Sequence, residues 1–313
     1  MATQILSGRW KLGLLLTLTT CFWWSILPIT LAGVLHKLDV HTVTFFRFFF
    51  AVAILLPILL LRPRAMAELQ VIKNRSVLKT IVIAGLLLSG NYALYVLALE
   101  RMSPAGAQVL IQMAPMLFLL SGVFLFKEPF SRWQWYGVVV FVAGLLLFFH
   151  LRLAAIIEGA MENNAYGIGM LSMLCAACCW SGYAIAQKNV APVLGSLQLM
   201  VVINLIGGFC FLPLAELSSV LTLNRFEWML LVLCGLNTVI AYGCFSEALN
   251  HWEASRISAT FTIVPLLTIG FVYLLGRFPI IDVVPEPMDV LSFIGALCVV
   301  AGATLASLAG SRR

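Results

Sequence analysis

The sequence predicts an all-α polytopic membrane protein with ten transmembrane helices, arranged as two inverted five-helix repeats with both termini in the cytoplasm. Three observations predict this fold: an apolar composition, ten apolar runs of spanning length, and a pattern that occurs twice. Of the 313 residues, 62% are hydrophobic and only 10% are charged. Soluble domains average about 45–50% apolar and about 25% charged residues. Lipid is therefore the expected solvent, and the bilayer the expected partner.

Ten segments are long and apolar enough to cross a bilayer, which takes about 20 mostly apolar residues. Lipid offers the backbone no hydrogen-bond partners, so each segment must be a helix or a strand of a closed barrel. The runs are continuous and lack strand-like alternation, which favours helices. The ten segments are 11–35, 42–61, 77–99, 105–126, 133–150, 166–187, 196–215, 226–249, 255–275 and 289–309.

The distribution of lysine and arginine between these segments predicts their orientation, because cytoplasmic loops are enriched in both residues. With the amino terminus inside, thirteen basic residues fall on the cytoplasmic face. The opposite face carries five, which are Lys37, Arg101, Arg152, Arg225 and Arg277. We therefore expect a multi-pass plasma-membrane protein, of a bacterial inner membrane, with both termini cytoplasmic. The net charge is +6, but the basic residues fall between apolar runs and are not interleaved with stacking aromatics, so no nucleic-acid partner is expected.

The second half of the chain repeats the pattern of the first. Three pairs of residues are each separated by 150 positions, namely Tyr92 and Tyr242, Ala105 and Ser255, and Pro115 and Pro265. Because five helices is an odd number, the second half must enter the membrane from the opposite side, which makes an inverted repeat. We divide the chain into a first repeat at 1–150, a linker at 151–164 and a second repeat at 165–313.

Glycines recur at seven-residue spacing in the last helix of each half. They are Gly137 and Gly144 in the first half and Gly295 and Gly302 in the second. Stripes of small residues let helix backbones approach closely. The stripes serve either packing within one chain or a homodimer, and the sequence leaves both open.

Two prolines at corresponding positions predict where a solute binds. Pro115 and Pro265 lie inside spans, and each frees the carbonyl four residues earlier, that of Ile111 or of Phe261. Free backbone groups at membrane depth are tolerated only where protein or a water-filled cavity satisfies them. Paired breaks of this kind are the best pointer in a sequence to the binding site of a transporter. We predict that both prolines act as helix breaks at a gate.

Polar and aromatic residues near these breaks are the candidate substrate-binding residues. Gln108 and Gln112 are four residues apart and share a helix face, and Ser258 and Thr262 occupy the matching positions. Further candidates lie inside other spans: Trp24, Ser25, Asn91, Tyr92, Tyr95, Trp180, Tyr183, Asn237 and Tyr242. An aromatic pocket with few polar groups suits a small, partly apolar solute. The alternative is that the polar residues join helices, at about 0.6 kcal/mol per hydrogen bond.

Charged residues inside the spans are few. Arg47 is the deepest, about two turns into the second segment, and it either meets an acceptor or extends to the interface. No Asp or Glu occupies the middle of a span, so a carboxylate proton relay is not evident. The sequence has no nucleophile–base pair or metal motif at span depth. No cofactor or metal is therefore expected, and an intramembrane enzyme or a non-transporting structural protein is the weaker alternative.

The chain resembles the EamA type of the drug/metabolite transporter superfamily over nearly its whole length. The family's hairpin of helices three and four resembles LALERMSPAGAQVL…APMLFLLSGVFLFKEP, and its second copy resembles EALNHWEASRISATFTIVPLLTIGFVYLLGRFP. The family's second helix resembles RFFFAVAILL, which begins at Arg47. One position departs from the pattern, since Phe278 stands where the second copy would carry the counterpart of Glu128.

The resemblance implies a fold and a function. It implies a central cavity lined by helices one, three, four, six, eight and nine of the family, which contain the candidate residues above. It also implies a secondary transporter that exports a small organic metabolite by alternating access. The expected substrates are amino acids, their derivatives or drug-like compounds.

Overall fold

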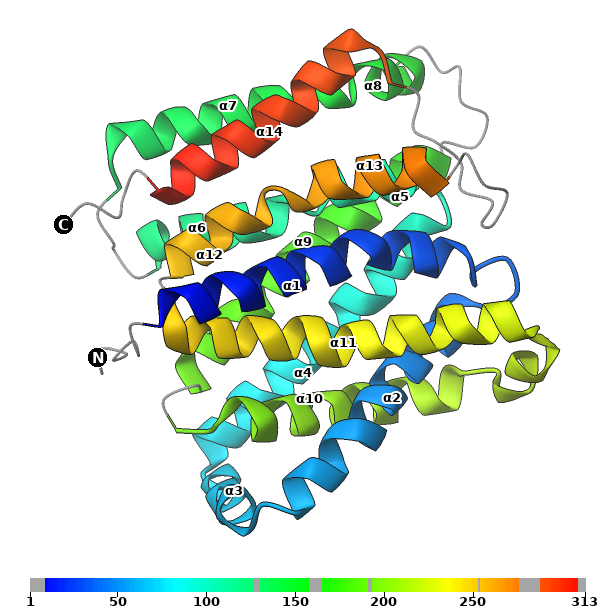
Figure 1. Cartoon of the computed structure of the whole chain (residues 1–313), viewed down its shortest axis with the longest axis vertical. Helices are drawn as coiled ribbons and strands as arrows, with labels where there is room; N and C mark the ends of the chain where they lie inside the picture. The colour runs from blue at the N-terminus through cyan, green and yellow to red at the C-terminus, as the bar shows by residue number, and fades with distance from the viewer. Residues whose placement is uncertain are drawn as a thin grey trace.

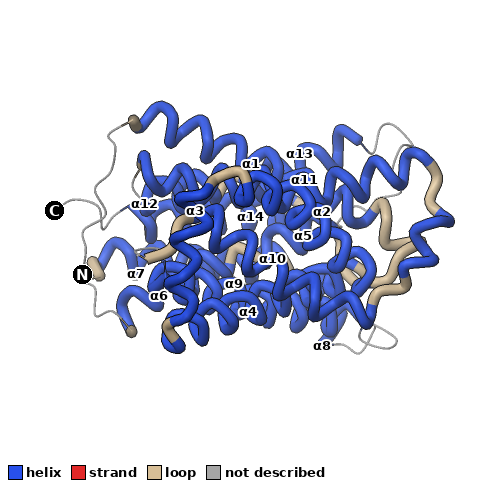
Figure 2. The backbone as a smooth tube through the Cα atoms, turned by 90° about the horizontal axis from the view of Figure 1, so that it is seen from below, coloured by secondary structure: helices blue, strands red, loops and turns tan. Residues whose placement is uncertain are grey.

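A computed structural model describes residues 9–125, 130–157, 165–190, 193–252, 254–275 and 288–308. This part of the chain is helical and contains no strand (Figure 2). Within it, nine helical segments are long and apolar enough to span a membrane, and one further apolar helix is shorter. These ten segments begin and end within three residues of the predicted positions. Glu128 and Phe278, where the repeat pattern departs, lie outside the described residues.

The first half contains four unbroken helices and one broken helix. Its long helices are α1 (Trp10–Ala32), α2 (Val40–Leu60), α4 (Arg75–Leu99) and the shorter α7 (Arg132–Phe148). The broken helix consists of α5 (Pro104–Leu110) and α6 (Met113–Phe124). Short helices α3 (Pro63–Glu68) and η1 (Leu69–Lys73) connect α2 to α4, and α8 (His150–Ile157) follows α7.

The second half has the same succession of elements. Its unbroken helices are α9 (Ala165–Val190), α10 (Ser196–Phe211), α11 (Arg225–His251) and α14 (Val290–Leu308). Its broken helix consists of α12 (Ala254–Phe261) and α13 (Val264–Leu275). The short 3₁₀ turns η3 (Leu212–Leu214) and η4 (Leu217–Thr222) connect α10 to α11.

Polar caps define where several of these helices begin. The Ser131 hydroxyl accepts a hydrogen bond from the Gln134 backbone, and the Gln134 side chain accepts one from the Ser131 backbone. Asn224 and Glu227 form the same reciprocal arrangement at the start of α11. Such capping boxes satisfy backbone N–H groups that a first helical turn leaves without partners.

Eight of the ten segments surround the centre of the molecule, and α7 and α14 lie together at one edge (Figure 1). Around the centre, successive neighbours in contact are α1, α11, α2, α10, α4, α9, α6 with α5, and α13 with α12. Exchanging the two halves reproduces this packing. For example, α4 packs on α9 and α1 packs on α11, and α10 packs on α4 as α11 packs on α2.

The glycine stripes of α7 and α14 face each other within one chain. A Cβ atom on Gly302 would lie 2.4 Å from the backbone nitrogen of Phe141, and one on Gly137 would lie 2.4 Å from that of Ala306. The Gln134 side chain adds a hydrogen bond to the Ala306 carbonyl, 3.0 Å long. These glycines are thus covered within the chain. A homodimer stays a prediction, and it would have to use other faces of the two helices.

Candidate functional site

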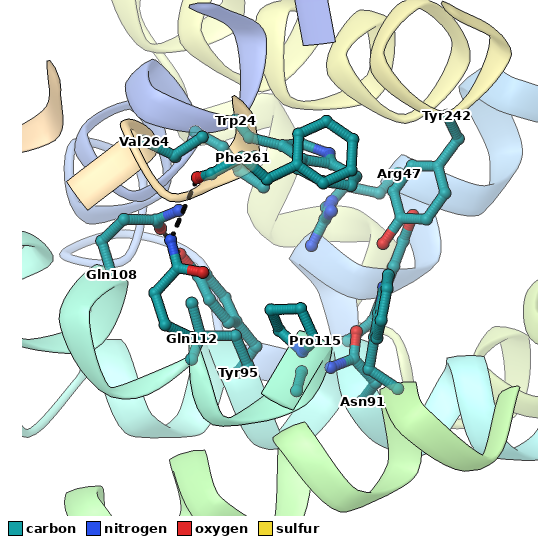
Figure 3. Close-up of a pocket in the computed structure, with 15 residues that line it drawn as sticks. Trp24, Arg47, Asn91, Tyr95, Gln108, Gln112, Pro115, Tyr242, Phe261 and Val264 are labelled. Carbon is teal, nitrogen blue, oxygen red and sulfur yellow. Dashed lines mark hydrogen bonds between the residues drawn. The ribbon is translucent and has the colours of Figure 1, made fainter. Parts of the chain in front are cut away.

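A cavity of about 90 Å³ lies at the centre of the molecule, between the two broken helices. This volume is several times what one ordered water needs. Figure 3 shows its walls, which come from α1, α2, α4, α9, α11 and both broken helices. The residues that line it are Trp24, Leu27, Arg47, Asn91, Tyr92, Tyr95, Gln108, Ile111, Gln112, Ala114, Pro115, Trp180, Tyr242, Phe261 and Val264.

The two broken helices meet at this cavity through one hydrogen bond. The helical backbone is interrupted between α5 and α6 at Ile111 and Gln112, and between α12 and α13 at Thr262 and Ile263. The Gln112 side-chain amide donates to the Phe261 carbonyl at 3.2 Å, as drawn in Figure 3. A side chain at the first break therefore satisfies the carbonyl that the proline of the second break sets free.

The first break does not leave a free carbonyl, and that part of the sequence prediction is wrong. The Ile111 carbonyl accepts a hydrogen bond from the Ala114 backbone at 2.8 Å, across one tight turn. A tightened turn of this kind supplies a donor three residues ahead, where an α-helix would have used the fourth. The two breaks thus differ, since the Ile111 carbonyl is satisfied locally and the Phe261 carbonyl by the other half of the chain.

Two further polar side chains of the cavity have partners in the described structure. The Tyr95 hydroxyl donates to the Gln108 side-chain oxygen at 2.9 Å, which joins α4 to α5. The Asn91 amide donates to the Ala176 carbonyl at 2.9 Å, which joins α4 to α9. These bonds fix the orientation of the side chains, so this part of the cavity wall is preorganised.

Aromatic rings form much of the remaining wall. The Trp24 ring centroid lies 4.8 Å from that of Phe261 and 5.5 Å from that of Tyr242, which joins α1 to α12 and α11. On the α9 side, Trp180 makes an edge-on contact with Phe118, with centroids 6.5 Å apart. Such offset and edge-on contacts add about 0.5–1.5 kcal/mol each beyond their buried area. They hold large apolar faces toward the cavity.

Arg47 is the single charged side chain among the described residues that line the cavity, and it is 2% exposed. Its guanidinium carbon lies 3.9 Å from the centroid of the Tyr92 ring. Phe48 stacks on the same ring at 4.9 Å with an interplanar angle of 11°. One face of the ring cannot accommodate both groups, and Arg47 lines the cavity while Phe48 does not, so Arg47 lies on the cavity face of Tyr92 and Phe48 on the other.

Three predicted residues are buried between helices and do not line the cavity. Ser25 donates to the Phe22 carbonyl within α1, and its own carbonyl accepts from Thr268 of α13. The Asn237 amide donates to the Trp23 carbonyl and joins α11 to α1. Tyr183 is buried in the apolar cluster around α2, α4 and α10. The Asn237 side chain thus has the helix-joining role that the sequence left as an alternative, whereas the Ser25 side chain bonds within its own helix.

The polar residues near the second break do not mirror those near the first. Thr262 lies 2.9 Å from the Thr304 hydroxyl of α14 and donates to the Ala259 carbonyl. Ser258 is half-buried on α12, and Pro265 is buried in α13, and neither lines the cavity. The reason is the packing of α12 against α14, which turns this face of the second broken helix away from the centre.

The sequence prediction missed the apolar part of the wall. Leu27 lies one turn after Trp24, and Val264 lies three residues after Phe261, so helical spacing from the aromatic residues could have found both. Ile111 and Ala114 flank the predicted Gln112 and Pro115. Arg47 was recognised as deep in the membrane, but nothing in the sequence shows which helix face meets the cavity.

The site has the composition of a binding cavity. Within the described residues, no group of three His, Cys, Asp or Glu side chains could hold a metal ion. The lining combines aromatic and aliphatic walls with three neutral amides and one cation. Pockets of this type bind small, largely apolar molecules and orient them by a few polar contacts.

Comparisons with known proteins agree with this description. The model of the EamA-like transporter family matches residues 11–150 and again residues 167–308. The chain is 32% identical to the uncharacterized inner membrane transporter YhbE of Escherichia coli, over 95% of this chain and 91% of the relative. It is also 32% identical to an uncharacterized transporter of Haemophilus influenzae, over 95% of both chains.

A more distant relative and a solved structure extend the comparison. The chain is 25% identical, over 68% of its length and 71% of the relative, to a protein of Salmonella typhimurium named as a probable amino-acid metabolite efflux pump. A crystal structure identified only as that of a protein superposes with a TM-score of 0.64 and 19% identity, over 96% of this chain and 99% of the other. The last comparison concerns the fold alone. The chain is thus a multi-pass inner-membrane protein and a transporter rather than an enzyme, and it belongs to the EamA-like transporter family.

Proposed function

We propose that this protein is a secondary transporter that exports a small organic metabolite by alternating access about the central cavity. The observation that carries the proposal is the position of the cavity between the halves. Eleven lining residues come from the first half and four from the second, and the two broken helices meet there. A rocking motion of one half against the other would open the cavity to each membrane face in turn.

The packing of the helices supports an inverted repeat. Most contacts between a long helix of one half and a helix of the other have a counterpart when the halves are exchanged, as for α4 on α9 and α1 on α11. The pair α7 and α14 is its own counterpart, as is the pair α2 and α10. Such exchange is expected of two similar halves related by a two-fold axis.

The ends of the helices support a topology with both termini cytoplasmic. Helix α1 begins and α14 ends at the same edge of the bundle in Figures 1 and 2. On one face, His36 and Lys37 after α1 contact Glu227 at the start of α11. On the other, Gln198 at the start of α10 donates to the Ala65 carbonyl of α3. The excess of basic residues on the face of the termini supports a cytoplasmic position for that face.

The expected substrates are amino acids, their derivatives or similar organic compounds. The Salmonella relative is named as an amino-acid metabolite efflux pump, and the cavity combines apolar walls with a few fixed polar groups. In the proposed cycle, the hydrogen bond from Gln112 to the Phe261 carbonyl joins the halves in one state and breaks when they move apart. Gln112 thus belongs both to the wall and to the gate.

Transport by purified protein in proteoliposomes tests this proposal. A panel of amino acids, acylated amino acids and amphiphilic amines should contain at least one compound that moves faster than in empty liposomes. Gln112→Ala removes the hydrogen bond to Phe261, worth about 1–3 kcal/mol when its buried partner is left unsatisfied. We expect the transport rate of this variant to differ from that of the wild type by roughly tenfold, since about 1.4 kcal/mol corresponds to a factor of ten.

The matched control is Gln70→Ala, because Gln70 is exposed on η1 and far from the cavity in the chain. It should transport at the normal rate. If no compound on the panel moves, the transport proposal fails. If Gln112→Ala transports normally while it remains folded, the proposed role of the cavity fails even though the protein transports.

A further inference from the structure

Arg47 is a permanently charged group at the wall of a cavity deep inside the bundle. It lies about two turns into α2, and its side chain is 2% exposed, so it does not extend to an aqueous interface. Arginine does not lose its proton in proteins, so burial cannot remove the charge. A buried charge is very costly unless it is paired and hydrogen-bonded.

The described part of the chain supplies no anion for this charge. The ion pairs among described residues involve other cations, and no carboxylate of a described residue lies in the cavity wall. The Nε atom of Arg47 is buried and has no hydrogen-bond partner there. The Tyr92 ring provides a cation–π contact at 3.9 Å, but this contact covers one face of the guanidinium and accepts none of its five N–H donors.

We propose, on the basis of the transport function above, that Arg47 receives the carboxylate of the substrate. A guanidinium has a planar fork of donors that matches a carboxylate with two parallel hydrogen bonds. The Tyr92 ring contacts one face of the guanidinium, and Phe48 stacks on the other face of the Tyr92 ring. The guanidinium points into the cavity in Figure 3, which leaves its terminal donors directed at a bound molecule.

The rest of the wall defines the body of that molecule. Trp24, Phe261 and Val264 present apolar surface to the same cavity, which suits an aliphatic or aromatic side group. The Gln108 oxygen already accepts a hydrogen bond from Tyr95, and the Asn91 amide already donates one to the Ala176 carbonyl. We therefore expect these two groups to limit the size of the cavity rather than to hydrogen-bond a ligand. The cavity thus fits a small organic acid with one carboxylate and an apolar body.

The charge balance distinguishes acids from free amino acids. An amino acid brings an ammonium group as well as a carboxylate, and the described lining contains no acid to pair with it. The ammonium would lie near the fixed charge of Arg47 at low dielectric, where like charges repel strongly. The assigned substrate class is therefore the monocarboxylate without a free ammonium group, such as an N-acylated amino acid.

Calorimetric titration of the purified full-length protein tests this assignment independently of transport. Three probes share one side chain and differ in charge: N-acetyl-L-leucine is an anion, L-leucine a zwitterion and L-leucinamide a cation. We expect the acetylated acid to bind most tightly, leucine at least about tenfold more weakly, and leucinamide not measurably. Equal affinities for the three probes would overturn the assignment, as would a protein that binds none of them.

Variants at position 47 separate recognition from folding. Arg47→Gln removes the charge and should weaken N-acetyl-L-leucine binding by at least about tenfold. Arg47→Lys keeps the charge without the planar fork of donors, so its affinity should lie between those of the wild type and Arg47→Gln. Arg225→Gln, at an exposed position at the start of α11, is the matched control and should bind like the wild type. Size-exclusion profiles and unfolding temperatures establish that each variant is folded. Normal affinity in folded Arg47→Gln would overturn the proposal.

The same variants in proteoliposomes distinguish this inference from the transport function. Binding that depends on Arg47 without any transport would support the carboxylate site and refute the transporter. Transport of an anionic carboxylate at an unchanged rate by Arg47→Gln would support the transporter and refute the carboxylate site.

Discussion

At the scale of single residues, Asp39 shows how one side chain fixes the start of a spanning helix. Its carboxylate accepts hydrogen bonds from the backbone nitrogens of His41, at 2.7 Å, and Thr42, at 3.0 Å. The Thr42 hydroxyl donates to it as well, at 2.5 Å. Partial burial raises the pKa of Asp39, but these hydrogen bonds from Thr42 and His41 outweigh it, so the pKa lies below its ordinary value of 3.8.

Replacing Asp39 therefore has a pH-dependent effect on stability. Asp39→Ala should lower the free energy of unfolding by about 1 kcal/mol near neutral pH, as for other lost N-caps. Because the native pKa is lowered, the stabilisation is present above pH 4 and is lost as the pH falls through the native pKa. Asp39→Asn keeps a good cap without the charge. The difference in unfolding temperature between wild type and Asp39→Asn should thus change only below about pH 4, and a difference that changes near pH 7 would contradict this account.

Single residues also show where sequence reasoning stops. The sequence identifies polar side chains at membrane depth, because they are few in an apolar chain. It does not show whether such a side chain faces a cavity or a neighbouring helix. Gln112 and Thr262 occupy matching positions, yet Gln112 reaches the centre and Thr262 contacts Thr304 of α14. The difference comes from tertiary packing, which a single sequence does not encode locally.

At the scale of elements, the contact between α7 and α14 depends on the absence of side chains. Gly302→Ala would place a Cβ atom 2.4 Å from the Phe141 nitrogen and 2.6 Å from the Gly137 carbonyl oxygen, both backbone atoms. The helices would have to separate, and overpacking of this kind costs about 1–3 kcal/mol. We expect a lower unfolding temperature and a lower yield of monodisperse protein.

The control for this change is Gly270→Ala in α13, since a Cβ atom there would have nothing within 4 Å. Alanine favours a helix over glycine by about 1 kcal/mol. This variant should therefore unfold at the same temperature as the wild type or slightly higher. Equal losses at positions 302 and 270 would show that close backbone approach is not what holds α7 to α14.

The spanning elements themselves were largely predictable. Their ends follow from the lengths of the apolar runs and from caps such as Ser131 and Asn224, which are local features. The helix breaks shortly before Pro115 and Pro265 were predictable for the same reason. What could not be predicted is the hydrogen-bonding at each break, because the donor to Phe261 comes from a residue 149 positions away.

At the scale of the whole molecule, the proposed topology can be measured directly. Reporters fused within 36–41, 151–164 and 276–288 should all report the periplasm, because each of these connections follows an odd number of spans from a cytoplasmic amino terminus. A fusion near position 195, after the sixth span, is the control and should report the cytoplasm. A cytoplasmic signal from 151–164 would contradict the inverted arrangement of the halves.

The pairing of α7 with α14 can form only late in biosynthesis, because the two helices lie far apart in the chain. The last residue of α14, Leu308, is translated 160 residues after Phe148, the last of α7. At about 5–20 residues per second, this takes roughly 8–30 s. During that interval the glycine face of α7 and the Gln134 amide have no α14 to contact. A nascent chain that stalls before α14 would therefore present an incomplete surface inside the bilayer, which membrane proteases could use to recognise it.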